Sequence, residues 1–169
     1  MNKNRLSIFL LLIILLLGCN SSKDILVEEK LDWPALLGRH DMIWEELPAR
    51  WVDAPHFGNA MIGSMLYRSD NNIMLQVFRS DVQDHRDGSH GWTAYSRPLL
   101  QVGHFMLETV GEPTGAEWRK DLWNAELHGV IHTDQGEIGI VHYVHAEKMV
   151  IVTELTPSEG EKGFTWSWH

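Results

Sequence analysis

The sequence predicts an all-β fold, an antiparallel β-sandwich that follows a cleaved signal peptide. After residue 31, short apolar segments of strand length recur along the chain and are separated by polar turn residues. Along several of them apolar and polar residues alternate, which is the period of a strand with one face in a core. We expect one domain, because about 140 residues follow the leader and no repeat with a period of roughly 20 to 50 residues is visible.

Residues 1–18 are typical of a bacterial lipoprotein signal peptide. Lys3 and Arg5 precede an apolar run from Leu6 to Leu17 that is too short to span a bilayer as a helix. The run ends in Leu-Leu-Gly-Cys, which resembles a lipobox, so we expect Cys19 to carry the lipid and become the mature N-terminus. The alternative is a signal peptide with an incidental cysteine, which leaves an exported thiol without a disulfide partner in the chain.

The domain organisation follows from this leader. Residues 19–30 are a polar, acidic tether, and the domain comprises residues 31–169. No Asp follows Cys19, and by resemblance to lipoprotein sorting rules this favours the outer membrane. We therefore expect a protein of the cell envelope, exposed to the periplasm or at the surface, that is held to its membrane by the lipid alone.

The charge of the mature chain disfavours anionic partners. Loss of Lys3 and Arg5 leaves 12 basic against 23 acidic residues, a formal charge of −11. Such a surface repels phosphate backbones and anionic lipid headgroups, so nucleic-acid binding is not expected. A neutral ligand is favoured.

Tryptophan is the second compositional signal, with eight residues in the chain. Large aromatic side chains dominate burial energetics, so the core is the favoured place for each of them. Exposed indoles are the alternative, and these stack on the C–H faces of sugars.

The clearest hairpin follows Gly58-Asn59, a pair that tolerates positive φ better than most residues. Two apolar runs, Ala60–Tyr67 and Asn72–Phe78, are joined by the polar connector Arg68–Asn71, which has the length that hairpins use. We expect later strands to continue this sheet.

The other stretches show less regular residue patterns. Residues 31–50 are compatible with a short helix that ends before Pro48 or with irregular structure. Residues 80–96, rich in Asp, His, Gly and Ser, are expected to form a long loop. Residues 99–108 alternate without a purely apolar face, as in a strand covered on both sides for part of its length, and residues 109–115 are expected to form a turn.

A second hairpin is predicted at residues 123–144. The face expected in the core holds Trp123, Ala125, Leu127, Gly129 and Ile131. With Gln135-Gly136 as a two-residue loop, Ile131 pairs with Ile140 and Leu127 with Val144. On the opposite face the same register sets His128 against Tyr143 and Glu126 against His145.

This opposite face is the first candidate site, with Glu126, His128, His132, Tyr143 and His145 within reach of one another. Histidine clusters bind zinc when three or four ligands converge at about 2 Å. The spacing matches no metal signature, so cross-strand pairs on a solvated or interdomain face are the favoured interpretation.

The second candidate site is the predicted loop, with Asp81, Asp84, Asp87 and His90. Oxygen ligands of this kind hold calcium, but the fixed ligand spacing of an EF-hand is missing, so a solvated acidic loop is favoured. We expect no metal and no cofactor.

Catalytic patterns are missing from the sequence. The only cysteine lies in the leader, and there is neither a Gly-x-Ser-x-Gly elbow nor a phosphate-binding glycine loop. A glycosidase needs two carboxylates about 5 to 10 Å apart across a sugar-sized cleft, and no spacing here imposes that geometry.

A series of short motifs nevertheless follows a definite order along the chain: Trp44, Leu47-Pro48, Gly58-Asn59, Ile62–Leu66, Tyr95–Leu107, Trp118–Leu122 with Ala125, Val130–Tyr143 and Val150–Leu155. In order and spacing they resemble the N-terminal β-sandwich domain of family 95 glycoside hydrolases, the α-L-fucosidase and α-L-galactosidase group. The family's usual Gly-Asn-Gly-Arg is Gly58-Asn59-Ala60-Met61 here, and residues 79–84 replace its Asn-Glu-x-x-Leu-Trp loop. These departures indicate a divergent branch.

The resemblance implies a supersandwich-like fold and a role without chemistry. In that family the catalytic acid and base belong to an (α/α)6 barrel downstream of the sandwich, so no catalytic residue is carried over to this chain. The expected function is that of the non-catalytic N-terminal domain of a carbohydrate-active lipoprotein, with a catalytic barrel downstream or on another chain as its partner. The alternative is a standalone carbohydrate-binding or scaffold lipoprotein with a glycan as its partner. A small metallohydrolase on the histidine face is the least favoured interpretation.

The last residues generate a first prediction. The chain stops within an alternating aromatic strand that puts Phe164, Trp166 and Trp168 on one face, so we expect an incomplete sandwich with an edge that seeks a partner. Residues 20–169 should therefore be marginally stable or self-associate, which sedimentation and thermal melting measure. A monomer that unfolds cooperatively well above room temperature would contradict this.

Overall fold

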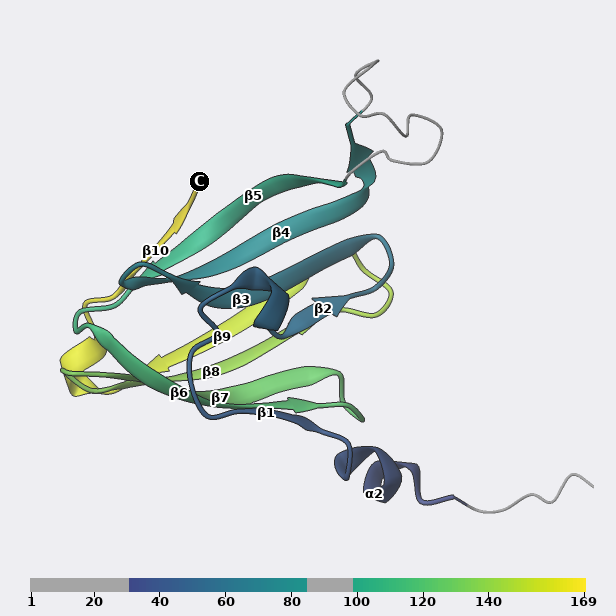
Figure 1. The fold of residues 1–169 in the computed structure, drawn as a ribbon, viewed down its shortest axis with the longest axis horizontal. Coiled ribbons are helices and arrows are strands. Elements are labelled where there is room, and N and C mark those ends of the chain that lie inside the picture. Colours follow the sequence, from purple (N-terminus) through teal and green to yellow (C-terminus); the bar gives the residue numbers. More distant parts are fainter. Residues whose placement is uncertain (1–30, 85–98) are drawn as a thin grey trace, which may run out of the picture. The chain divides into compact units, whose positions relative to one another are not determined.

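A computed structural model describes residues 31–84 and 99–169 (Figure 1). Within these residues most of the chain is β-strand, and the strands form two five-stranded sheets in which every neighbouring pair is antiparallel. The predicted all-β sandwich is therefore confirmed. Asp87 and His90 of the second candidate site, like Cys19, lie outside the described residues.

The first sheet has the order β1-β6-β7-β8-β9, and the second sheet has the order β10-β5-β4-β3-β2. The strands of the first sheet are β1 (Met42–Trp44), β6 (Pro113–Asp121), β7 (Glu126–Thr133), β8 (Glu137–Val144) and β9 (Ile151–Pro157). Those of the second sheet are β2 (His56–Gly58), β3 (Ile62–Ser69), β4 (Asn72–Gln83), β5 (Leu99–Glu108) and β10 (Thr165–Trp168). Three short helices complete the description: α2 (Trp33–Gly38), η1 (Trp51–Asp53) and η2 (Glu159–Glu161).

The core lies between the facing sides of the two sheets. Strand alternation directs every second side chain inward, and the buried residues are Leu66, Ile73, Leu75 and Leu107 from the second sheet and Trp118, Leu127, Ile131, Ile138 and Ile140 from the first. Full burial of a side chain of this size stabilises the fold by about 1.5–3 kcal/mol. The apolar pattern that predicted the strands is thus the pattern that holds the sheets together.

Both predicted hairpins exist, but the second has another register. In β3–β4, Ser69 pairs with Asn72 around a two-residue loop. In β7–β8, Ile131 pairs with Ile138 and Glu126 with Tyr143, so each partner is two residues earlier than predicted. The reason is that the turn comprises residues 133–136 and is therefore centred one residue earlier than the predicted loop Gln135-Gly136. Within it, the hydroxyl of Thr133 accepts hydrogen bonds from the backbone N–H groups of Gln135 and Gly136.

Several predicted boundaries were wrong. Strand β4 continues to Gln83, so the expected loop does not begin at Ser80, and β6 already begins at Pro113, within the expected turn. Trp123 is not in the core: it lies in the β6–β7 turn and is 49% exposed. In residues 31–50 the structure has the short helix that was one of the two expectations: α2 ends before Pro48 and is followed by β1.

Strand β5 shows why its alternation was mixed. Phe78 pairs with Gln101 but the preceding Val77 pairs with Gly103, so Val102 is an extra residue in a β-bulge. The inward and outward positions exchange at this point. Leu99 and Leu100 before the bulge are exposed, so this part of the strand is not covered on both sides by described residues.

Glu161 fixes the turns at one end of the sandwich. Its buried carboxylate accepts hydrogen bonds from the backbone N–H groups of Val110 (2.8 Å) and Gly111 (2.9 Å) and from the hydroxyl of Thr133 (2.5 Å). Desolvation raises the pKa of this carboxyl, but the three donors outweigh it, and the pKa of Glu161 lies below its ordinary value. The charge therefore stays in place and holds the β5–β6 and β7–β8 turns to η2.

Asn59 fixes the β2–β3 turn to the loop between β8 and β9. Its Oδ1 accepts from the backbone N–H groups of Met61 (3.1 Å) and Ile62 (3.0 Å), and its Nδ2 donates to the carbonyl oxygens of His145 and Lys148, both at 2.9 Å. One amide thus connects the second sheet to the first sheet's β8–β9 loop.

Asn59→Asp tests this connection, because it keeps the acceptor and removes both N–H donors. With a net contribution of about 0.5–1.5 kcal/mol for each lost hydrogen bond, the free energy of unfolding should fall by about 1–3 kcal/mol in urea denaturation. The control is Gln135→Glu, the same amide-to-acid change at an exposed turn, which should stay within about 0.5 kcal/mol of the native chain. Equal losses in both variants would show that Asn59 connects nothing.

Candidate functional site

The residues of the predicted polar face lie on the outer side of the first sheet, but they form separate pairs. His128 Nε2 lies 2.9 Å from Glu126 Oε2, and Tyr143 is the cross-strand partner of Glu126. His132 lies further along β7, and His145 follows the end of β8. The structure therefore brings three of the five predicted residues together.

The other two histidines have different surroundings. His132 Nδ1 lies 3.3 Å from a carboxylate oxygen of Glu137, and its Nε2 lies 3.8 Å from one of Glu117. The Nδ1 of His145 accepts a hydrogen bond from the backbone N–H of Glu147. Within residues 31–84 and 99–169, no three His, Cys, Asp or Glu side chains converge as they would around a metal ion.

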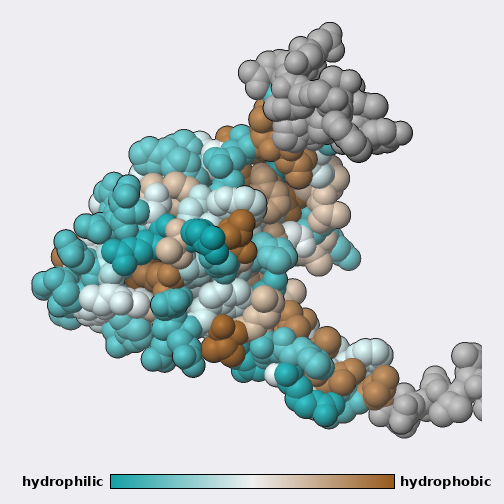
Figure 2. Space-filling model, in the orientation of Figure 1, coloured by the Kyte–Doolittle hydropathy of each residue, from teal (hydrophilic) through white to brown (hydrophobic). Residues whose placement is uncertain are grey.

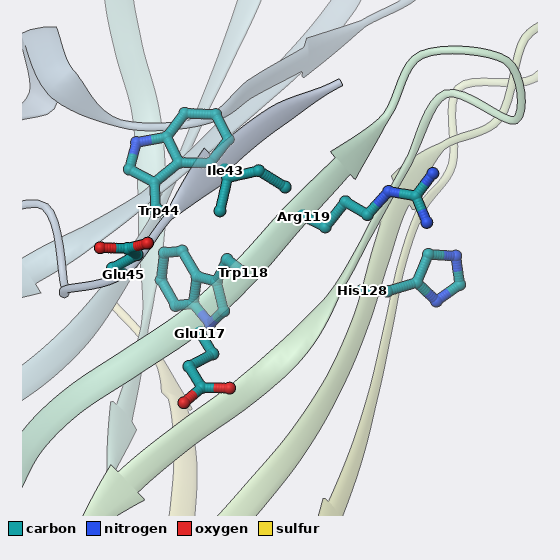
Figure 3. A pocket seen from close by; sticks show the side chains of 7 residues that line it. All are labelled: Ile43, Trp44, Glu45, Glu117, Trp118, Arg119 and His128. Atoms are coloured by element: carbon teal, nitrogen blue, oxygen red, sulfur yellow. The ribbon is translucent and has the colours of Figure 1, made fainter. Parts of the chain in front are cut away.

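A shallow depression of about 520 Å³ adjoins His128 (Figure 3). Its lining comes from β1 and the residue after it, from β6 and from β7, and consists of Ile43, Trp44, Glu45, Glu117, Trp118, Arg119 and His128. Figure 3 shows Arg119 and His128, which are cross-strand partners, pointing to the same side. The depression is thus bordered by two carboxylates, a guanidinium and an imidazole.

The guanidinium and the imidazole of this depression already face carboxylates. Arg119 Nε donates to Asp41 Oδ2 at 2.6 Å, and the buried Asp41 carboxylate also accepts from the backbone N–H of Leu122. Since His128 faces Glu126, both basic side chains have carboxylate partners. The Asp41–Arg119 pair connects β6 to the residue before β1.

Trp118 marks the inner wall of the depression. Its indole lies over Gly129, where a Cβ would come within 2.5 Å of Trp118 Cδ1. The Nε1 of Trp118 is buried and has no hydrogen-bond partner, whereas the Nε1 of its neighbour Trp44 donates to the carbonyl oxygen of Asp53 at 2.8 Å. Close packing against glycine holds Trp118 in place at the cost of one indole hydrogen bond.

The two described residues of the second candidate site lie at the end of β4. Asp81 belongs to β4 and forms a bidentate ion pair with Arg79, whose hydrogen bond is the main reason that the pKa of Asp81 lies below its ordinary value. Asp84 is only 7% exposed. Asp81 is thus exposed but belongs to a strand, and Asp84 follows the strand but is buried, so neither residue matches the expected solvated loop in full.

Sequence reasoning missed a histidine in the core. His142 of β8 is fully buried, with Nε2 2.8 Å from Ser64 Oγ of β3 and Nδ1 2.9 Å from Thr153 Oγ1 of β9. A neutral imidazole has one donor and one acceptor, and a hydroxyl can serve either. The signal was present, because His142 falls on the inward-facing series Ile138, Ile140 and Val144.

This group resembles a serine–histidine pair, but its geometry is that of a structural bridge. Ser64 has no exposed surface, so a substrate cannot reach its hydroxyl in this conformation. Burial lowers the pKa of His142 from 6.5 to about 3. The ring therefore stays neutral at ordinary pH and connects the two sheets.

The outer faces of the two sheets differ in charge. On the first sheet, one row across the strands reads Arg119, His128, Val141 and Glu154. On the second sheet, two neighbouring rows read Met65, Gln76 and His104, then Tyr67, Met74 and Met106. These two rows contain no Asp, Glu, Lys or Arg, so this face suits neutral contacts.

The buried imidazole generates a pH prediction. Between pH 6.5 and about 3 the unfolded chain binds a proton at residue 142 and the folded chain does not, so stability is present above this window and is lost as the pH falls through it. Within this window, the free energy of unfolding measured by urea denaturation should rise with pH more steeply for the native chain than for His142→Gln. The difference in slope should be up to about 1.4 kcal/mol per pH unit. Identical slopes for the native chain and His142→Gln would contradict the prediction.

Among the described residues, no helix is both long and apolar enough to cross a membrane. Comparisons of the chain with protein-family models, with curated proteins and with solved structures find no match. The function of the chain therefore has to be inferred from its own residues.

Proposed function

We propose that this chain is the non-catalytic β-sandwich domain of a carbohydrate-active envelope lipoprotein. It is similar to the N-terminal domain of family 95 glycoside hydrolases and braces an (α/α)6 catalytic barrel that lies downstream or on another chain. A lipid on Cys19 anchors it in the outer membrane. The observation that carries this proposal is that the motif residues have framework roles in the sandwich.

The Gly-Asn motif supports the proposal most directly. The family pattern Gly-Asn-Gly-Arg has glycine where this chain has Ala60, and Ala60 has a φ of 71°, in the left-handed region that glycine favours. The preceding Asn59 uses both ends of its amide to join the two sheets. A turn built for glycine and asparagine thus persists although one glycine is replaced.

The segment Trp118–Leu122 supports it in the same way. Trp118 is among the largest fully buried side chains, and Arg119 is held by Asp41. Asp121 accepts hydrogen bonds from the backbone N–H groups of Trp123 and Asn124 and from the Asn124 side chain, and the bonds from Asn124 are the main reason that its pKa lies below the ordinary value. These residues pack the core and close the β6–β7 turn, which are the tasks of a supporting domain.

Hydrolysis assays and the downstream coding sequence test the proposal together. The chain alone should not hydrolyse 4-nitrophenyl α-L-fucopyranoside or α-L-galactopyranoside above the buffer rate. The adjoining DNA should encode long amphipathic helices, and their product, co-expressed with this chain, should co-purify with it and hydrolyse one of these glycosides.

Activity of the chain alone would overturn the proposal. His128→Ala and His132→Ala then locate the centre, because loss of activity in either favours a small hydrolase on the histidine face. His40→Ala, another exposed histidine, is the matched control and should leave any rate unchanged. Downstream DNA without helices of this kind would exclude a barrel that continues this chain and would leave only a barrel on another chain.

A standalone carbohydrate-binding lipoprotein is the second candidate function. The observation that favours it is the pair of uncharged rows on the outer face of the second sheet, which suit a neutral ligand in a chain of net charge −9.

A further inference from the structure

We propose that the outer face of the second sheet carries a binding site for a neutral oligosaccharide beside Trp51. The site is a depression of about 420 Å³ between η1 and strands β3, β4 and β5. This volume lies in the range of about 300–1,000 Å³ that is typical of small-molecule sites. The inference goes beyond the supporting role proposed above and does not depend on a catalytic partner.

The walls of the depression combine aromatic and amide side chains. Trp51 comes from η1, Tyr67 from β3, Phe78 and Gln76 from β4, and Gln101 from β5. Figure 2 shows apolar surface gathered over the ends of β4 and β5 on the right of the view, and the exposed Leu99, Leu100 and Val102 belong to this part of β5. Beneath the site β3 and β4 pair without interruption, and β5 joins them through the pair Phe78–Gln101, beside the bulge at Val102.

Trp51 is the exposed platform of the site. It is 62% exposed, the largest fraction among the exposed apolar side chains of the described residues. An indole presents a broad apolar surface and dominates the contact energy wherever a ligand covers it. The apolar C–H face of a sugar ring is a surface of matching shape and character.

The polar groups of the depression are oriented and neutral. The Tyr67 hydroxyl donates to Gln76 Oε1 at 2.9 Å, which fixes the amide so that its N–H groups remain as donors. Burial raises the pKa of Tyr67 above 10.0, so the phenol stays uncharged. Gln101 is exposed on the neighbouring strand and adds a second amide.

The lining of the depression disfavours both ionic and purely apolar ligands. None of the described residues that line the depression is charged, so an ionic ligand finds no counterion there. A purely apolar partner, such as the apolar face of a helix, would bury the two amides without hydrogen-bond partners, and each unsatisfied group costs about 1–3 kcal/mol. A neutral polyol with an apolar face and a hydroxyl rim satisfies both the aromatic and the amide walls.

Calorimetric titration of the full chain tests the site. The probes are 2′-fucosyllactose, cellohexaose, xylohexaose, laminarihexaose and mannohexaose, with hexagalacturonate as the charged counterpart. At least one neutral probe should bind at millimolar concentration or below, and hexagalacturonate should bind more weakly than that probe. Trp51→Ala should weaken the binding by about tenfold or more, and Gln101→Ala should weaken it severalfold.

Trp123→Ala is the matched control, because Trp123 is also an exposed indole (49%) but lies on the β6–β7 turn of the first sheet. It should bind the probe as the native chain does, and thermal melting should show that all three variants fold. Failure of every neutral probe to bind, native affinity in Trp51→Ala, or an equal loss in Trp123→Ala would overturn the site. Sedimentation tests whether a second copy of the chain occupies this face instead. A dimer that dissociates in Trp51→Ala, together with no sugar binding, would assign the face to that second copy.

Discussion

The hydrogen-bonded bridge from Ser64 through His142 to Thr153 is the constraint on which the sandwich depends most. It crosses from the second sheet to the first within an otherwise apolar core, and its ring meets the edge of Phe57 at a centroid distance of 5.2 Å. Apolar contacts are non-directional and would tolerate sliding of one sheet on the other. A buried imidazole with two fixed partners does not, because leaving either nitrogen unpaired is costly.

The turns repeat this principle at the ends of the strands. Asn59 binds backbone groups of its own turn and of the β8–β9 loop. Glu161 binds backbone N–H groups of the β5–β6 turn and the hydroxyl of Thr133 in the β7–β8 turn. Each is fixed by different chemistry, the first by a neutral amide and the second by a carboxylate that its three donors keep ionised. The packed core, the imidazole bridge and the side chains of Asn59 and Glu161 hold the two sheets together. The outer faces of the sheets can therefore differ in charge and composition.

That difference bears on function. The first sheet carries exposed ion pairs such as Glu126 with His128, which contribute little to stability because water screens them. The second sheet carries methionine, glutamine and aromatic side chains in the same positions, although the chain is strongly acidic. Two uncharged rows on the outer face of such a chain favour contact with an uncharged partner, which suits both a supporting role next to a catalytic barrel and a sugar site at Trp51.

The sequence by itself determined the all-β fold, both hairpins and most of the inward-facing residues, because strand alternation is a local property that residues 60–78 and 123–144 display plainly. It did not determine the β7–β8 register, since a shift of two residues leaves every side chain on its face and changes only its partner. Glu126 and His128 lie close together because they are near neighbours on one strand. His132 and His145 do not join them, because the register shift changes the cross-strand partners and His145 lies beyond the end of β8. Only the tertiary structure decided the partners of His142, because Ser64 is 78 residues away, and the depression beside Trp51, because its walls come from four separate elements.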